Sequence, residues 1–255
     1  MIASEIVGSR GPYSVFVHGW LRAQSAFEPL RTIAQERSER WILVDLRGYG
    51  RSRPATGQYT VDEAANDLIE LTDALQVPAA RWIGHSMGGL IIQKVAQFAP
   101  KKVTRLVGIA PVPLSGIALD PRAWSVYNSA CRDPDVRLRI LTHLTAQERF
   151  EPPHESWIAT SLEETRPAVL ARYLHSWGCV EGDSPPVHPS LIPMTLLVGT
   201  RDPAITSALI EREFVPRYAD LDVHRIEGAG HFPIEERLDA VRAYFTQPDG
   251  DSRNQ

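Results

Sequence analysis

The chain has 255 residues, of which 43% are hydrophobic and 23% charged, and its formal net charge is −4. This composition is typical of a globular domain and excludes a disordered or fibrous chain. The slight acidic excess excludes a broad cationic surface, so we expect neither nucleic acid nor an anionic membrane as a partner. No apolar run reaches the roughly 18 residues of a membrane-spanning helix, so we expect no membrane segment.

The N-terminus and the cysteines indicate where the protein works. Residues 1–7 contain an early acid, Glu5, and too short an apolar stretch for a secretory signal. Cys131 and Cys179 are too few for a disulfide framework and lack metal-site spacing. We therefore expect free thiols, no metal or other cofactor, and a cytoplasmic protein.

Short apolar runs along the chain predict β-strands. They are mostly continuous rather than alternating, as expected for parallel strands covered on both faces. The runs are residues 13–17, 41–44, 81–83, 103–109, 194–198 and 221–226. Apolar side chains at helical spacing lie between them, over residues 61–75 after the N-cap Thr60 and over 90–98 before Pro100. This alternation predicts an α/β fold with a doubly wound, mostly parallel sheet.

One long stretch, residues 114–193, contains no clear buried strand. Aromatic side chains are spread along it: Trp124, Tyr127, Phe150, Trp157, Tyr173 and Trp177. A connection this long is not a bare loop in a compact domain. We predict a helical cap insertion over the ends of the strands, between core parts at residues 1–113 and 194–246, with a flexible tail at residues 247–255.

Residues 84–88 read Gly-His-Ser-Met-Gly, the form G-x-S-x-G, between a predicted strand and a predicted helix. Ligands of a doubly wound sheet bind beyond the carboxyl ends of the strands, where this motif lies. Such a turn holds its serine on a strained backbone with the hydroxyl exposed, and glycine allows the close approach of strand and helix. Ser86 is therefore a candidate nucleophile; the alternative is a serine that only caps the helix.

A serine hydroxyl needs a base to remove its proton, and the base needs a partner that fixes its tautomer. Asp202 follows the strand predicted at 194–198, and His231 follows the one at 221–226. This chain order suits three side chains that meet at one edge of a parallel sheet. The alternatives are a helix N-cap for Asp202 and a buried structural role for His231. The other histidines considered, which we interpret as surface or packing residues, are His143, His154, His175, His188 and His224.

Acyl transfer also needs two donors for the oxyanion that forms in the transition state. The backbone N–H of Met87, at the start of the helix after the nucleophile, is one candidate. The second candidate is the backbone N–H of Trp20, in the loop after the first predicted strand, where Gly19 lets the chain bend closely.

Taken together, these segments resemble the α/β-hydrolase fold family over nearly the whole chain. They are His18-Gly19, residues 45–52, residues 84–89, residues 199–203 and residues 228–231. The resemblance implies a nucleophile at Ser86, an acid at Asp202, a base at His231 and oxyanion donors at Trp20 and Met87. It also implies a structural role for residues 45–52. In the family a longer hairpin usually precedes the His-Gly loop, so we expect the first strand or two to be missing here.

A serine at position 86, rather than an aspartate, excludes the haloalkane dehalogenases and epoxide hydrolases of that family. The leading hypothesis is hydrolysis of a carboxylic ester or related acyl bond through an acyl-enzyme. The substrate would be a small apolar or aromatic molecule bound by Trp20, Trp124, Trp157 and Trp177.

Two other hypotheses remain open. The same three residues could abstract a proton, as in a C–C bond hydrolase, a lyase or a cofactor-free dioxygenase. Leu21 follows Trp20 where the similar perhydrolases tend to have proline, which disfavours the perhydrolase variant. A non-catalytic ligand receptor on the same scaffold is the third possibility. No motif specifies the oligomeric state.

Overall fold

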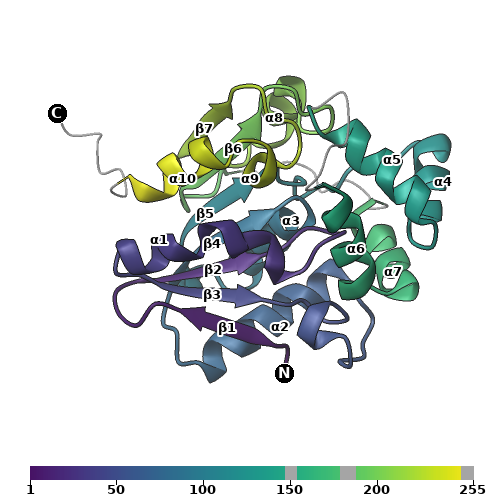
Figure 1. The fold of residues 1–255 in the computed structure, drawn as a ribbon. Helices are drawn as coiled ribbons and strands as arrows, with labels where there is room; N and C mark the ends of the chain where they lie inside the picture. Colours follow the sequence, from purple (N-terminus) through teal and green to yellow (C-terminus); the bar gives the residue numbers. More distant parts are fainter. Residues whose placement is uncertain (147–153, 179–187, 248–255) are drawn as a thin grey trace.

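The computed structural model describes residues 1–146, 154–178 and 188–247. Its centre is a seven-stranded sheet in the order β1-β3-β2-β4-β5-β6-β7 (Figure 1). The strands are β1 (Ser4–Val7), β2 (Tyr13–Val17), β3 (Arg40–Val44), β4 (Ala80–His85), β5 (Val103–Ile109), β6 (Met194–Gly199) and β7 (Leu221–Ile226). Only the β1–β3 pair among these is antiparallel, so the predicted mostly parallel sheet is confirmed.

One strand, β1, precedes β2, and it was not predicted from the sequence. The expected absence of the family's first strand or two stays a prediction. β1 pairs antiparallel with β3, in a register that runs from Ser4 opposite Val44 to Val7 opposite Trp41. Only Val7 of this strand is buried, and Ile6 is exposed. Because β1 lies at the edge of the sheet and is covered incompletely, it lacks the continuous apolar run that marks the inner strands.

Helices cover both faces of the sheet, as a doubly wound fold requires. On one face, α2 (Val61–Ala74) and α3 (Met87–Phe98) share a hydrophobic cluster with Trp82. On the other face, α1 (Arg31–Glu36) and α10 (Leu238–Thr246) share a second cluster with Phe16. The remaining core helices are α8 (Ser207–Glu213), α9 (Pro233–Glu236) and the short 3₁₀ helices η1 (Gln24–Leu30), η2 (Gly50–Ser52) and η3 (Pro100–Lys102). The predicted N-cap of α2 is confirmed, since the Thr60 side chain accepts a hydrogen bond from the Glu63 N–H.

The described part of the long insertion is mostly helical. Its helices are α4 (Pro121–Ala130), α5 (Pro134–Leu144), α6 (His154–Glu164) and α7 (Pro167–Gly178). Asp120 and Asp133 cap the first two of these, each followed by a proline at the first helical position. The four helices lie together beyond the carboxyl ends of the central strands, where a cap was predicted (Figure 1). The division of the chain at residues 113 and 193 stays a prediction.

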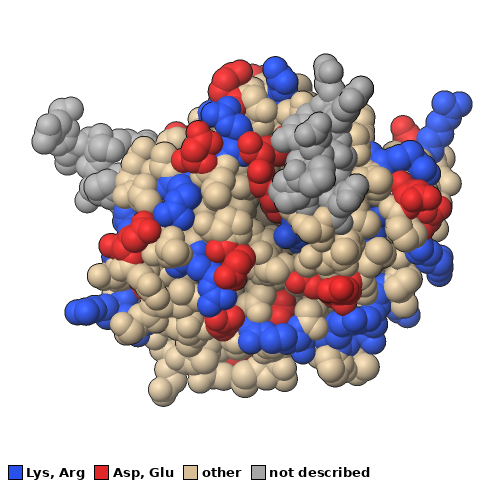
Figure 2. All heavy atoms as spheres, in the orientation of Figure 1, with Lys and Arg blue, Asp and Glu red and all other residues tan. Residues whose placement is uncertain are grey.

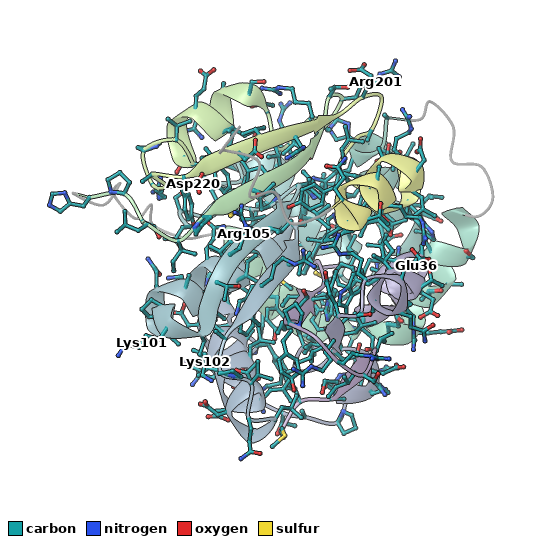
Figure 3. The ribbon with its side chains drawn as sticks, turned by 90° about the vertical axis from the view of Figure 1, so that its left-hand side faces the viewer. Glu36, Lys101, Lys102, Arg105, Arg201 and Asp220 are labelled. Atoms are coloured by element: carbon teal, nitrogen blue, oxygen red, sulfur yellow. The ribbon has the colours of Figure 1, made fainter. Side chains whose placement is uncertain are left out.

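Charged side chains are scattered among other residues on the surface of the molecule. On the face shown in Figure 2, acidic and basic residues are interspersed. Figure 3 places Arg201, which follows β6, and Lys102, which precedes β5, at opposite ends of the molecule. Cys131 is a buried free thiol, while Cys179 and residues 248–255 lie outside the described part. Within residues 1–146, 154–178 and 188–247, the helices are too short or too polar to cross a membrane.

Candidate active site

Ser86 lies on a sharp turn between the end of β4 and the start of α3. Its backbone has φ of 51° and ψ of −116°, a conformation that residues with side chains rarely adopt. The neighbouring glycines make the turn possible. A Cβ atom at Gly84 would lie 2.3 Å from the Gly88 carbonyl oxygen, and one at Gly88 would lie 2.2 Å from the Val17 carbonyl oxygen. The strained strand–turn–helix geometry predicted for the motif is therefore confirmed.

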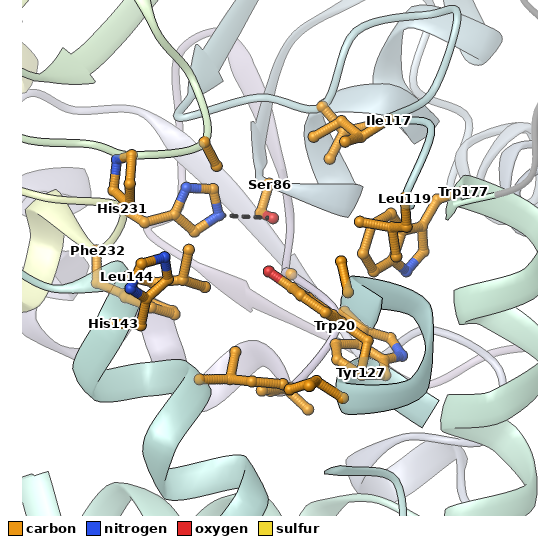
Figure 4. Close-up of a pocket in the computed structure, with 18 of the residues that line it drawn as sticks. Trp20, Ser86, Ile117, Leu119, Tyr127, His143, Leu144, Trp177, His231 and Phe232 are labelled. Carbon is orange, nitrogen blue, oxygen red and sulfur yellow. Dashed lines mark hydrogen bonds between the residues drawn. The ribbon is translucent and has the colours of Figure 1, made fainter. Parts of the chain in front are cut away.

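The structure brings Ser86, His231 and Asp202 into one hydrogen-bonded chain. His231 Nε2 lies 2.9 Å from Ser86 Oγ, and His231 Nδ1 lies 2.9 Å from Asp202 Oδ2 (Figure 4 shows the first of these contacts). His231 and Asp202 are both buried. Because an ionised carboxylate only accepts, Nδ1–H donates to Asp202, which leaves Nε2 free to accept the hydroxyl proton of Ser86.

Asp202 uses its two oxygens for different purposes. Oδ1 accepts hydrogen bonds from the N–H groups of Ala204 and Ile205, at 2.8 and 3.1 Å. Burial raises the pKa of this carboxyl, but His231 and the two N–H groups together lower it further, so the net pKa lies below the ordinary value. One carboxylate therefore holds the turn after β6 and contacts His231. The helix N-cap considered for Asp202 was wrong, since the N-cap of the next helix, α8, is Thr206.

Two further histidines are buried beside these residues and were missed as site residues in the sequence. His85 Nε2–H donates to the His231 carbonyl oxygen at 2.9 Å, and burial lowers the pKa of His85 to about 3. His18 Nε2 accepts from the Leu46 N–H at 3.1 Å, and Nδ1–H donates to the Gly19 carbonyl at 2.9 Å. Burial lowers the pKa of His18 to about 4. Both rings are therefore neutral near pH 7, and their hydrogen bonds hold the neighbouring backbone segments in place.

The loop that carries Trp20 is held in place from two sides. The Trp20 carbonyl accepts from the Tyr49 hydroxyl at 2.9 Å, and its indole Nε1–H donates to the Leu170 carbonyl of α7 at 2.8 Å. The Trp20 backbone N–H has no acceptor among the described residues. Met87 is the first residue of α3, a position whose N–H has no partner within the helix. Both predicted donors thus have the free N–H groups that the prediction requires.

A cavity of about 600 Å³ opens onto Ser86 and His231 (Figure 4). Apolar and aromatic side chains dominate its wall, including Trp20, Val112, Ile117, Leu119, Tyr127, Ile140, Leu144, Trp177 and Phe232. Of the four tryptophans predicted to bind substrate, Trp20 and Trp177 belong to this wall.

Trp124 and Trp157 lie outside the wall that the described residues form, contrary to expectation. The Trp124 ring packs against His175 of α7, with ring centroids 6.0 Å apart. Trp157 packs against two residues of the wall, since its ring lies 5.9 Å from that of Phe232 and the Arg22 guanidinium lies over it. An aromatic residue in a cap helix can face either the cavity or a neighbouring helix, and the sequence alone did not distinguish them.

Other wall residues were not singled out from the sequence. Tyr127 was noted only as one of the aromatic residues of the insertion, and His143, interpreted as a surface or packing residue, is exposed but also lines the cavity. Helical spacing on α4 and α5 could have suggested them, since Ala123, Val126 and Tyr127 share one side of α4. Among the residues that the structure describes, no group of three or more His, Cys, Asp or Glu side chains is placed to hold a metal ion.

The comparison with known families agrees with this architecture. Residues 15–244 match the model of the alpha/beta hydrolase family. The chain belongs to that family. The matched residues include most of β2, strands β3 to β7, the turn at Ser86 and the cap helices described above.

Two curated relatives and one solved structure illustrate how similar this alpha/beta hydrolase is to others. The 3-oxoadipate enol-lactonase 2 of Acinetobacter baylyi is 30% identical over 181 residues, which cover 66% of this chain and 63% of that protein. The pimeloyl-(acyl-carrier protein) methyl ester esterase of Shewanella woodyi is 28% identical over 219 residues, which cover 72% and 81%. The enol-lactonase structure from Burkholderia xenovorans has a TM-score of 0.79 and 22% identity, and covers 95% of this chain and 94% of that one. That structural likeness shows the shared fold.

Proposed function

We propose that this alpha/beta hydrolase is a serine hydrolase that cleaves a carboxylic ester or related acyl bond through an acyl-enzyme on Ser86. The observation that carries the proposal is the hydrogen-bonded chain from Ser86 through His231 to Asp202, 2.9 Å at each contact, at one wall of an apolar cavity. In this arrangement Ser86 is the nucleophile, His231 the base and Asp202 the acid.

The first half of the reaction forms the acyl-enzyme. Ser86 Oγ attacks the carbonyl carbon while its proton passes to His231 Nε2, and Asp202 stabilises the resulting imidazolium. The negative charge on the carbonyl oxygen is met by the backbone N–H groups of Trp20 and Met87. When the tetrahedral intermediate collapses, the bond to the alcohol oxygen breaks and His231 returns the proton to that oxygen.

The second half releases the acyl group as a carboxylic acid. A water molecule gives a proton to His231 Nε2 and attacks the acyl carbon, and the same donors hold the second oxyanion. The bond to Ser86 Oγ then breaks, and His231 restores the serine hydroxyl. No atom or electron is left over, so the two halves need only the ester and water.

The relatives and the cavity support this choice of reaction. An enol-lactonase and a methyl ester esterase are both named for ester substrates. The apolar wall, which includes Trp20 and Trp177, suits a small apolar or aromatic substrate in a cavity of about 600 Å³. A cytoplasmic location, where the buried thiol of Cys131 stays reduced, is part of the same proposal.

A fluorophosphonate probe tests the proposal, because it labels an activated serine. We expect the wild type to be labelled, and Ser86→Ala to lose both labelling and turnover of a panel of small esters. Equal labelling of the two proteins would contradict the proposal. If Ser86→Ala kept most turnover of some substrate while His231→Ala lost it, the proton-abstraction alternative would replace acyl transfer.

A further inference from the structure

The cavity wall contains a hydroxyl group that acyl transfer does not use. Among the described wall residues, only Ser86 and Tyr127 carry a side-chain oxygen. Tyr127 belongs to α4 of the cap, and Figure 4 shows its hydroxyl pointing into the cavity, toward the side on which Ser86 and His231 lie.

The Tyr127 hydroxyl has no hydrogen-bond partner among the described residues, unlike the hydroxyls of the buried Tyr49 and Tyr218. The hydroxyl of Tyr49 donates to the Trp20 carbonyl at 2.9 Å, and that of Tyr218 donates to Gln93 Oε1 at 3.2 Å. The Trp177 indole Nε1 of the same wall is also unpaired, but of the two groups only the Tyr127 hydroxyl is both a donor and an acceptor that points into the cavity. A polar group so placed in an apolar pocket is available to bind and orient a ligand.

The ring of Tyr127 is held by two aromatic neighbours. It stacks on Trp20 with centroids 5.7 Å apart and planes at 27°, and meets Trp177 edge-on at 5.8 Å and 76°. Both neighbours also line the cavity. The direction of the hydroxyl is therefore set before a substrate binds, which favours a specific contact.

The hydroxyl also stays protonated. Burial raises the pKa of Tyr127, and the negative charge of Asp202 raises it further. At neutral pH the group is thus a hydrogen-bond donor on the cap side of the cavity, and it points toward Ser86 and His231.

We propose that Tyr127 determines specificity by donating a hydrogen bond to an oxygen in the acyl part of the substrate, close to the scissile carbonyl. The preferred substrates are then small, largely apolar esters that carry an ether, keto or hydroxyl oxygen at that place. An all-hydrocarbon acyl group would expel water from the cavity and leave the Tyr127 hydroxyl unpaired, so it binds its transition state less well. This inference rests on the proposed acyl transfer at Ser86.

Matched pairs of 4-nitrophenyl esters test the inference. Methoxyacetate and butyrate have acyl chains of nearly equal size, as do 3-methoxypropionate and pentanoate, and each pair differs by one ether oxygen. We measure kcat/KM for both pairs with the wild type and with Tyr127→Phe, which removes only the hydroxyl. For at least one pair, we expect the variant to lose about tenfold on the oxygenated ester and less than about twofold on its hydrocarbon partner.

Tyr59→Phe is the matched control, because Tyr59 bonds to Ala55 and Arg166 and does not line the cavity. Tyr59→Phe should leave the ratio of kcat/KM between the two esters of each pair unchanged. A similar loss with Tyr127→Phe on both members of each pair, or no loss on any ester, would overturn the inference. If the wild type itself neither turns over the esters nor reacts with a fluorophosphonate, the proposed function fails and the role of Tyr127 fails with it. That result is distinguishable because it precedes any comparison of variants.

Discussion

The backbone N–H of His231 donates a hydrogen bond of 2.8 Å to the carbonyl oxygen of Leu144, the last residue of α5. The loop that carries the imidazole is therefore attached directly to the cap. Trp20 is attached in the same way, through its indole bond to the Leu170 carbonyl of α7. The cap thus supports two loops of the candidate site besides covering the cavity.

Glu236 completes the attachment of the His231 loop. Its Oε2 accepts from the N–H groups of Gly230 and Ala146, at 2.9 and 2.7 Å, and its Oε1 accepts from the Phe232 N–H at 3.0 Å. Glu236→Gln offers one carbonyl oxygen in place of two and adds an amide donor that faces donors. We expect kcat to fall about tenfold, with KM changed less than about twofold, because the base is displaced rather than the substrate site. Steady-state kinetics on a small ester measures both constants.

The control for this variant is Asp239→Asn, which changes an exposed carboxylate whose side chain pairs with Arg237. It should leave kcat unchanged. A normal kcat in Glu236→Gln, or an equal fall in both variants, would show that Glu236 does not position His231.

Gly88 allows the close approach on which the turn at Ser86 depends. A Cβ atom there would lie 2.2 Å from the Val17 carbonyl oxygen and 2.7 Å from that of His18, both backbone atoms. Gly88→Ala should displace the loop that carries Trp20 and lower kcat about a hundredfold, and the bulkier Gly88→Val should lower it further. Gly178→Ala, whose Cβ would meet only side chains at 3.3 Å or more, is the control. A fully active Gly88→Val enzyme would mean that the nucleophile lies elsewhere.

Trp20 and Trp124 were both predicted to bind substrate, but they should respond differently to substitution. Trp20→Phe removes the indole bond to Leu170 and changes the stacking on Tyr127, so we expect kcat/KM to fall about tenfold. Trp124→Phe should change kcat/KM less than about twofold, because Trp124 packs against His175 outside the cavity wall. Comparable losses in the two variants, measured on one ester, would contradict this assignment.

Acid should destabilise the fold through two buried histidines. The pKa of His18 is lowered to about 4 and that of His85 to about 3 from the usual 6.5, both by burial. Below pH 6.5 the unfolded chain binds these protons and the folded chain does not, so the free energy of unfolding falls as the pH falls. Each histidine adds a slope of up to about 1.4 kcal/mol per pH unit until its own folded pKa is reached.

Urea unfolding between about pH 6 and pH 5 measures the net slope, a range in which Asp202 plays little part. Burial raises the pKa of Glu235 to about 7, so the folded chain binds a proton there that the unfolded chain does not, and this offsets part of the slope from the histidines. The lowered pKa of Asp202 makes its contribution fall only as the pH drops below about 4. His85→Gln should make the slope shallower, because one titrating group is removed. An equal slope in His85→Gln and the wild type would contradict the buried, neutral state of His85.

The sequence alone predicted the inner strands and the turn at Ser86. The inner strands are continuous apolar runs because both of their faces are covered, and the turn at Ser86 was recognisable because its flanking glycines must permit backbone contact. The meeting of Asp202 and His231 followed from topology, since parallel strands end at one edge of the sheet. The edge strand β1 was missed because partial cover requires no apolar run.

Tertiary structure alone decided which cap residues face the cavity and which support the site. Trp177 and Trp124 both belong to cap helices, but only Trp177 lines the cavity. Neither the hydroxyl of Tyr127 nor the carboxylate of Glu236 follows from a motif. The cap is positioned by contacts between distant segments, such as the bond from Trp20 to Leu170 across 150 residues. Such contacts depend on how amphipathic helices rotate and pack against the core, and helical spacing specifies an apolar face without specifying what it meets.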